Sequence, residues 1–194
     1  MARTYQKSLP RKEQIVNAAR KLVIKCGSEN VTVRRIAAEV GFSEAAIYRH
    51  FKSKKDILYL LIESIETNLI ADLGSYNKRE SGRLDTILHN HLSSVEMRKG
   101  VSFQVIAEII SLGDKRLNRR IYETIEKYIS KLKEVLLEEI QNGTLHKDID
   151  VDATSIILFS IVQGLSNIWT LSNYSFKPQD KLDSILNILR KGLT

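Results

Sequence analysis

The chain has 194 residues, of which 43% are hydrophobic and 27% charged, with only 2 Pro and 9 Gly. This composition suits an all-helical folded protein and excludes a disordered or all-β chain. The single cysteine, Cys26, excludes an intrachain disulfide and fits a reducing compartment. The amino-terminal residues lack an apolar signal core, and no apolar run is expected to reach the length of a membrane span. We therefore expect a cytoplasmic protein without a membrane partner.

The positive charge is concentrated near the amino terminus. Residues 1–55 hold 13 Lys and Arg against 4 Asp and Glu, a net charge of +9, whereas residues 56–194 hold 17 against 19, a net charge of −2. Such a cluster supplies the salt-dependent part of DNA affinity, because its cations displace counterions from the phosphates. The alternative is a solvated basic surface that serves solubility only.

The first segment, residues 1–10, lacks periodicity and predicts a flexible arm. It either frays or lies along DNA through Arg3 and Lys7. A first helix is expected from about residue 11 to residue 25, with Gly27 as its stop. Its buried stripe is expected to be Ile15, Ala18, Ala19, Leu22 and Val23.

Residues 32–51 predict two short helices joined by a tight turn. Thr32 is the expected N-cap of the first helix and Gly41 its left-handed stop, and Ser43 is the expected N-cap of the second. Phe42 and Ile47 have the spacing of a hydrophobic staple, which fixes the angle at which the second helix begins. Its outward residues are expected to be Glu44, Ala45, Tyr48, Arg49 and His50. A short helix with small and basic exposed residues suits insertion into a major groove.

The next stretch, Tyr48-Arg49-His50-Phe51-x-Ser53-Lys54-x-x-Ile57-Leu58, resembles the Y-x-x-F-x-S-K-x-x-L pattern of the TetR family of regulators. The resemblance is close over about the first 60 residues and architectural beyond them. It implies a helix-turn-helix DNA-binding domain at residues 1–55 and a helical effector-binding and dimerisation domain at residues 56–194. The implied function is a homodimeric transcriptional regulator, a repressor released from a palindromic operator on double-stranded DNA by a small apolar effector.

The resemblance also implies roles for single residues in DNA binding. Phosphate contacts are expected from Thr32, Tyr48, His50 and Lys54. Base edges are expected to be read by Ser43, Glu44, Ala45 and Arg49, with Arg34 or Arg35 at the groove edge. The alternative role for Tyr48 and Phe51 is packing between helices, and for Phe51 we expect packing.

The remainder of the chain predicts six further helices, about nine in all, and no sheet. Ser53 should cap the fourth helix, and Asp56 should complete part of a capping box. The expected helices span about 54–73, 84–96, 101–112, 115–141, 151–173 and 179–191, with a loop at 74–82. Because residues 151–173 are apolar nearly all round, they must be covered on most sides. With the last helix they form the expected dimer interface, and the alternative is a purely intramolecular core.

In the TetR family the middle helices of the second domain enclose an effector pocket. The residues expected to line it here are Leu88, His91, Leu92, Phe103, Gln104, Ala107, Glu108, Tyr122, Ile125, Leu165 and Trp169. An apolar pocket with few polar groups suits a lipid-like or aromatic effector. The segment LLEEIQNGTL and the later Trp169 resemble the acyl-CoA-responsive regulators of fatty-acid metabolism, so acyl-CoA is a candidate effector; no cofactor is expected.

Catalytic and metal-binding patterns are not found in the sequence. His89 and His91 are two residues apart, so they should point to different faces of a helix. Glu138 and Glu139 are expected on a solvated helix face, and we expect no enzyme. A second function stays open, because SEAAIYRHFKSK and LIESIETNLI also resemble TetR-type nucleoid-occlusion factors, which bind many chromosomal sites and a division protein.

Overall fold

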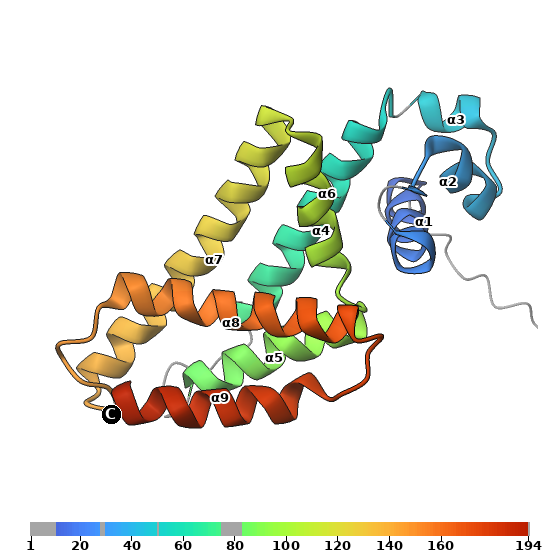
Figure 1. Ribbon diagram of the computed structural model, residues 1–194. Helices are drawn as coiled ribbons and strands as arrows, with labels where there is room; N and C mark the ends of the chain where they lie inside the picture. Colours follow the sequence, from blue (N-terminus) through green and yellow to red (C-terminus); the bar gives the residue numbers. More distant parts are fainter. Residues whose placement is uncertain (1–10, 28–29, 50, 75–82, 194) are drawn as a thin grey trace, which may run out of the picture.

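A computed structural model describes residues 11–27, 30–49, 51–74 and 83–193, and within these ranges the chain is helical and contains no strand. The helices are α1 (Arg11–Cys26), α2 (Val33–Val40), α3 (Glu44–Tyr48), α4 (Lys54–Gly74), α5 (Arg83–Met97), α6 (Val101–Leu112), α7 (Lys115–Gln141), α8 (Val151–Leu171) and α9 (Pro178–Leu193) (Figure 1). The predicted all-α fold is confirmed. The predicted arm at 1–10, His50 and the loop residues 75–82 lie outside the described residues.

The helices form a small amino-terminal unit and a larger body. Helices α1, α2 and α3 pack together, and α4 leaves this unit to run through the body, where it contacts α5, α6 and α7 (Figure 1). Helices α5, α8 and α9 pack against one another at the far end of the body. Helix α4 therefore connects the first three helices to the body, and α1 also contacts α6 of the body directly.

One hydrophobic core extends from the amino-terminal unit into the body. The predicted stripe of α1 is buried throughout, as are Ile57, Leu61 and Ile65 on α4. Because α4 packs against α1 on one side and against body helices on others, its apolar residues cover more than one face. Near the end of α4, Ile70 is left 52% exposed.

The turn between α5 and α6 packs against the end of α8 and the residues that follow it. Gly100 has a φ of 67°, and a Cβ there would lie 2.8 Å from Oγ1 of Thr170, so a larger residue would strain the backbone and force Thr170 to shift. Asn173 and Tyr174 have φ values of 53° and 62°, so the chain leaves helical geometry at the point where the sequence predicts that α8 continues to residue 173. Helix α8 therefore ends at Leu171.

Two predictions about the body are wrong. Helix α8 is long and apolar enough to cross a membrane by length and composition, contrary to the expectation that no such run exists. In the structure it packs against α5, α7 and α9, with Ser155 and Ser166 fully buried. Glu139 was expected on a solvated face but is only 5% exposed, because it lies on the side of α7 that carries the buried Leu136.

Candidate DNA-binding surface

The two short helices are held by the caps that the sequence predicts. Thr32 precedes α2, and its side-chain oxygen accepts a hydrogen bond from the backbone N–H of Arg35 at 3.2 Å. Gly41 follows α2 with a φ of 70°, and its N–H donates to the carbonyl of Ala37. Nothing lies within 4 Å of a Cβ built at Gly41, so this glycine is needed for its left-handed backbone and not for space.

Helix α3 is held by a cap at its amino-terminal end and by two buried side chains. The Ser43 side chain accepts a hydrogen bond from the N–H of Ala46 at 3.2 Å, which confirms it as the N-cap. Ile47 is completely buried and Phe51 is 6% exposed, so both anchor the helix to the core. For Phe51 the packing interpretation is confirmed. The opposite face presents Glu44, Ala45, Tyr48 and Arg49, all of them exposed.

Arg34 of α2 lies beside the outward face of α3. Nε of Arg34 lies 3.9 Å from Oε1 of Glu44, and both side chains are largely exposed. A surface pair of this kind contributes little to stability, so both groups remain available for DNA. Arg35 instead turns back toward the protein, where its Nη1 donates to the carbonyl of Asn30 at 3.0 Å. Of the two arginines predicted at the groove edge, Arg34 is therefore the better placed.

The start of α4 is closed by Asp56. Its Oδ2 accepts hydrogen bonds from the N–H groups of Lys52 at 2.6 Å and Ser53 at 3.0 Å, and the bond from Ser53 is the one that the predicted capping box assigns to Asp56. Both groups are thereby engaged, so a phosphate at this helix end has to bind elsewhere in the first turn. Lys54 begins the helix, but its side chain is outside the described part of the structure.

Lys55, the next residue, ties the start of α4 to the body. Its ammonium donates to Oδ2 of Asp114, which also caps α7 by accepting from the N–H groups of Arg116 and Leu117. The pKa of Asp114 is lowered, mainly by the hydrogen bond from Lys55 and next by the hydrogen bond from the N–H of Leu117. The sequence offered no indication of this pair, because the two residues are 59 positions apart.

Substitutions at Thr32 are expected to separate its capping role from DNA contact. Thr32→Ala should lower the free energy of unfolding by about 1 kcal/mol, because the N–H of Arg35 loses its acceptor. Thr32→Asp should keep that stability but weaken DNA binding, because a carboxylate repels phosphates. Urea unfolding and DNA titration of both variants measure the two effects, with Thr32→Ser as the control that keeps both. Equal DNA affinity for Thr32→Asp and Thr32→Ser would mean that this position does not face DNA.

The residues predicted to line an effector pocket do not share one environment. Those fully or nearly buried in the core are Leu88, His91, Leu92, Phe103, Leu165 and Trp169. Gln104, Glu108 and Ile125 are half-buried, whereas Ala107 is exposed and Tyr122 is 60% exposed. The assignment of an effector pocket to the eleven predicted residues stays a prediction.

The two neighbouring histidines of α5 point in different directions, as expected. His89 contacts Gln179 and Asp183 of α9, and His91 contacts Tyr128 of α7.

His91 is a polar group packed in the core. Its Nδ1 lies 2.7 Å from the hydroxyl of the buried Tyr128, a residue that the sequence pattern did not single out. Burial, and secondarily the charge of Arg98, lower the pKa of His91 from 6.5 to about 3. The folded protein therefore holds His91 neutral, and protonation of this ring works against the fold.

Acid should therefore destabilise the protein through His91. The unfolded chain binds this proton near pH 6.5 and the folded chain only near pH 3, so the contribution to stability is complete above 6.5 and falls as the pH decreases below it. Between about pH 7.5 and about pH 5.5, the loss is about 1.4 kcal/mol. His91→Gln should remove that part of the pH dependence in urea unfolding. An unchanged pH dependence in His91→Gln would contradict this assignment.

Segments that match known protein families cover nearly the whole chain. Residues 15–59 match the family described as bacterial regulatory proteins, tetR family, and residues 54–192 match the C-terminal region of YsiA-like proteins. The nucleoid occlusion factor SlmA of Colwellia psychrerythraea is 31% identical over 183 residues, which are 92% of each chain.

Solved structures with the same fold include two regulators. A TetR transcription regulator from Haloarcula marismortui superimposes with a TM-score of 0.81 at 19% identity, covering 94% of this chain and 98% of that one. The FadR regulator from Bacillus subtilis in complex with stearoyl-CoA gives a TM-score of 0.75 at 22% identity, covering 95% and 100%. At 19% and 22% identity, these two similarities establish a shared fold.

Proposed function

Because the chain belongs to the TetR family of bacterial regulatory proteins, we propose that it is a cytoplasmic transcriptional repressor that binds a palindromic operator and is released by a small effector. The observation that carries the proposal is the exposed face of α3. Ser43 caps this helix, Ile47 anchors it, and Glu44, Ala45 and Arg49 are left outward. A rigid helix with polar and small outward residues, in the segment of net charge +9, suits major-groove reading.

A dimer gives two such helices the two-fold symmetry of a palindrome. Its proposed interface is formed by α8 and α9, where large apolar side chains remain uncovered in the single chain. These are Ile156, Ile157, Ile168 and Leu171 on α8 and Ile188 on α9, between 46% and 84% exposed. Pairing of the two helices with those of a second chain would bury them, which also accounts for an α8 as apolar as a membrane span.

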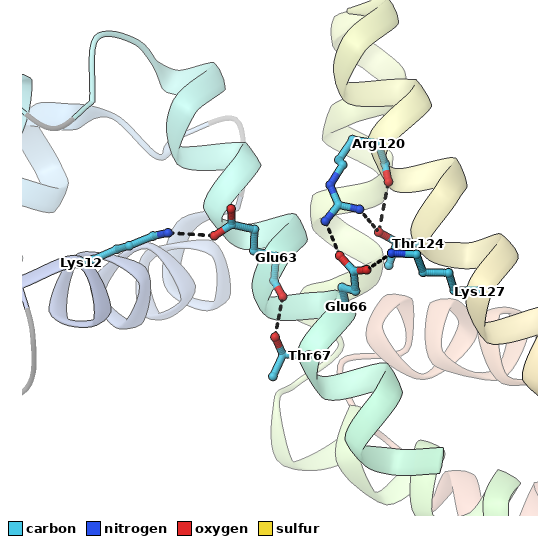
Figure 2. A network of polar contacts seen from close by, with 7 residues as sticks. All are labelled: Lys12, Glu63, Glu66, Thr67, Arg120, Thr124 and Lys127. Carbon is cyan, nitrogen blue, oxygen red and sulfur yellow. Dashed lines mark hydrogen bonds and ion pairs between the residues drawn. The ribbon is translucent and has the colours of Figure 1, made fainter. Parts of the chain in front are cut away.

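Helix α4 is the proposed route from effector to DNA. Figure 2 shows Glu66 of α4 between Arg120 and Lys127 of α7, while Glu63 of α4 accepts from Lys12 of α1 at 2.9 Å. The hydrogen bond from Lys127, together with that from Arg120, lowers the pKa of Glu66 although burial opposes it. A shift of α7 around an effector would therefore pull on α4, and α4 would carry the movement to α1.

A long-chain acyl-CoA is the proposed effector. The many apolar side chains of α5, α6 and α8 and the fold shared with a stearoyl-CoA complex support this choice. The test is fluorescence anisotropy of a labelled duplex from the region upstream of this gene, with and without stearoyl-CoA, the ligand in the solved FadR complex. Release of the DNA by acyl-CoA but not by free CoA supports the proposal. Binding that ignores acyl-CoA rejects this effector and leaves the DNA-binding part standing.

The SlmA relatives favour a second function, a nucleoid-occlusion factor that binds many chromosomal sites. The similarity to the Colwellia psychrerythraea protein covers both domains, at 31% identity. Mapping of chromosomal occupancy distinguishes the two functions. A few sites beside promoters support the repressor, whereas many sites dispersed over the chromosome support nucleoid occlusion.

A further inference from the structure

A cavity of about 540 Å³ lies where the amino-terminal unit meets the body. Its walls come from α1, the end of α2, α4, the end of α5 and the start of α6. It is therefore separate from the predicted effector pocket, none of whose eleven residues lines it. Its volume falls within the roughly 300–1,000 Å³ of small-molecule sites.

The cavity combines an apolar wall with two guanidinium groups. Met97, which is 76% exposed at the end of α5, and the half-buried Val40 at the end of α2 contribute apolar surface, whereas Arg20 of α1 and Arg98, just before α6, contribute charge. Arg20 donates to the neutral Oδ1 of Asn17 over 3.5 Å. A nearby lysine of the same lining, Lys21, is already paired with Glu39 at 3.7 Å.

The two arginines repel each other in partly buried surroundings. Burial, and then the like charge of Arg98, lower the pKa of Arg20, although Glu13 opposes this. Both side chains are half-buried. An anion placed between them would offset both the lost hydration and the repulsion, and a carboxylate can accept from two guanidinium groups at once.

We propose that this cavity binds an amphipathic monocarboxylate, with its carboxylate between Arg20 and Arg98 and its alkyl chain against Val40 and Met97. A medium-chain fatty acid has this chemistry. The bound acid sits between α1, which belongs to the DNA-binding unit, and α4 and α6, which belong to the body, so it alters the angle between the two parts. This regulatory step rests on the proposed function, and the anion site itself does not.

The binding test uses the full-length protein and isothermal titration with decanoate. Arg20→Gln and Arg98→Gln should each weaken decanoate binding by about tenfold or more, because each removes a charge-assisted hydrogen bond. Decan-1-ol, which has the same chain and no charge, should also bind at least about tenfold more weakly. Arg116→Gln is the matched control, because Arg116 is exposed on α7 outside the cavity lining.

A second variant tests the cavity without touching either arginine. Ser64→Leu adds bulk on the α4 wall and should reduce decanoate binding. Circular dichroism verifies that each variant is folded. Equal decanoate affinity in the wild type, both arginine variants and Ser64→Leu would overturn the site, as would equal affinity for decan-1-ol.

DNA titration then separates the site from the proposed function. The expected result is that decanoate weakens operator binding of the wild type and has no effect on Arg20→Gln. Decanoate binding without any change in DNA affinity would overturn the regulatory step. Failure of the untreated wild type to bind DNA would count against the proposed function alone, because decanoate binding is measured independently.

Discussion

Replacing Ile168 with glutamate is expected to convert the protein to a monomer and to lower its operator affinity by about 100-fold or more. Ile168 is 60% exposed on α8, within the apolar surface proposed to pair with a second chain. A carboxylate buried there without a partner opposes association. The loss is large because two DNA-binding units joined in a dimer bind two half-sites at a high effective concentration, whereas a monomer binds one. Light scattering and anisotropy on the same sample measure mass and affinity.

The matched control is Ile110→Glu. Ile110 is 66% exposed near the end of α6, and Figure 1 shows that this end of the helix adjoins the start of α7 and not α8 or α9. This variant should remain dimeric and keep its DNA affinity. A wild-type protein that is monomeric in light scattering, or an Ile168→Glu protein that stays dimeric, would contradict the interface.

Ala45→Leu is expected to change which operator the protein prefers. Ala45 is exposed on α3 behind the Ser43 cap, in the first turn of the helix proposed to enter the major groove. Added bulk at a base edge changes the contact with one base pair of each half-site, and one mismatch costs about 1–3 kcal/mol. The expected result is a shift of about tenfold or more in relative affinity across an operator library, with little change in affinity for random DNA.

Ala38→Leu is the control for this change. Ala38 is exposed on α2, so the same bulk is added to the neighbouring helix. It should leave the operator ranking as it is in the wild type. A uniform loss of affinity for every sequence in Ala45→Leu would show that residue 45 does not lie at base edges.

The fold and the helix-turn-helix could be predicted from the sequence because their determinants are local. Thr32, Gly41 and Ser43 act on backbone groups within a few positions of themselves, and the structure contains each cap as predicted. Periodic apolar residues likewise located the helices, with differences at the ends such as Leu171 against residue 173. Tyr48 is 49% exposed, as a phosphate contact requires, although the contact itself stays a prediction.

The features that were missed depend on residues far apart in the chain. The hydrogen bond between His91 and Tyr128 joins residues 37 positions apart, so helical periodicity along either helix carries no trace of it. The cavity between Arg20 and Arg98 requires α1 to lie against α6, which no local pattern specifies. Buried Glu139 was misjudged for a related reason, because its neighbouring lysines suggested a solvated face that the packing of α7 does not provide.

The most direct test of the account is an anisotropy titration of the wild-type protein with a duplex from its own upstream region and with a random duplex of equal length. The account predicts two chains bound per specific duplex, an affinity at least about 1,000-fold higher than for random DNA, and a steep decrease of both affinities with salt. Equal affinity for the two duplexes, or binding that salt does not weaken, would contradict a sequence-reading role for α3.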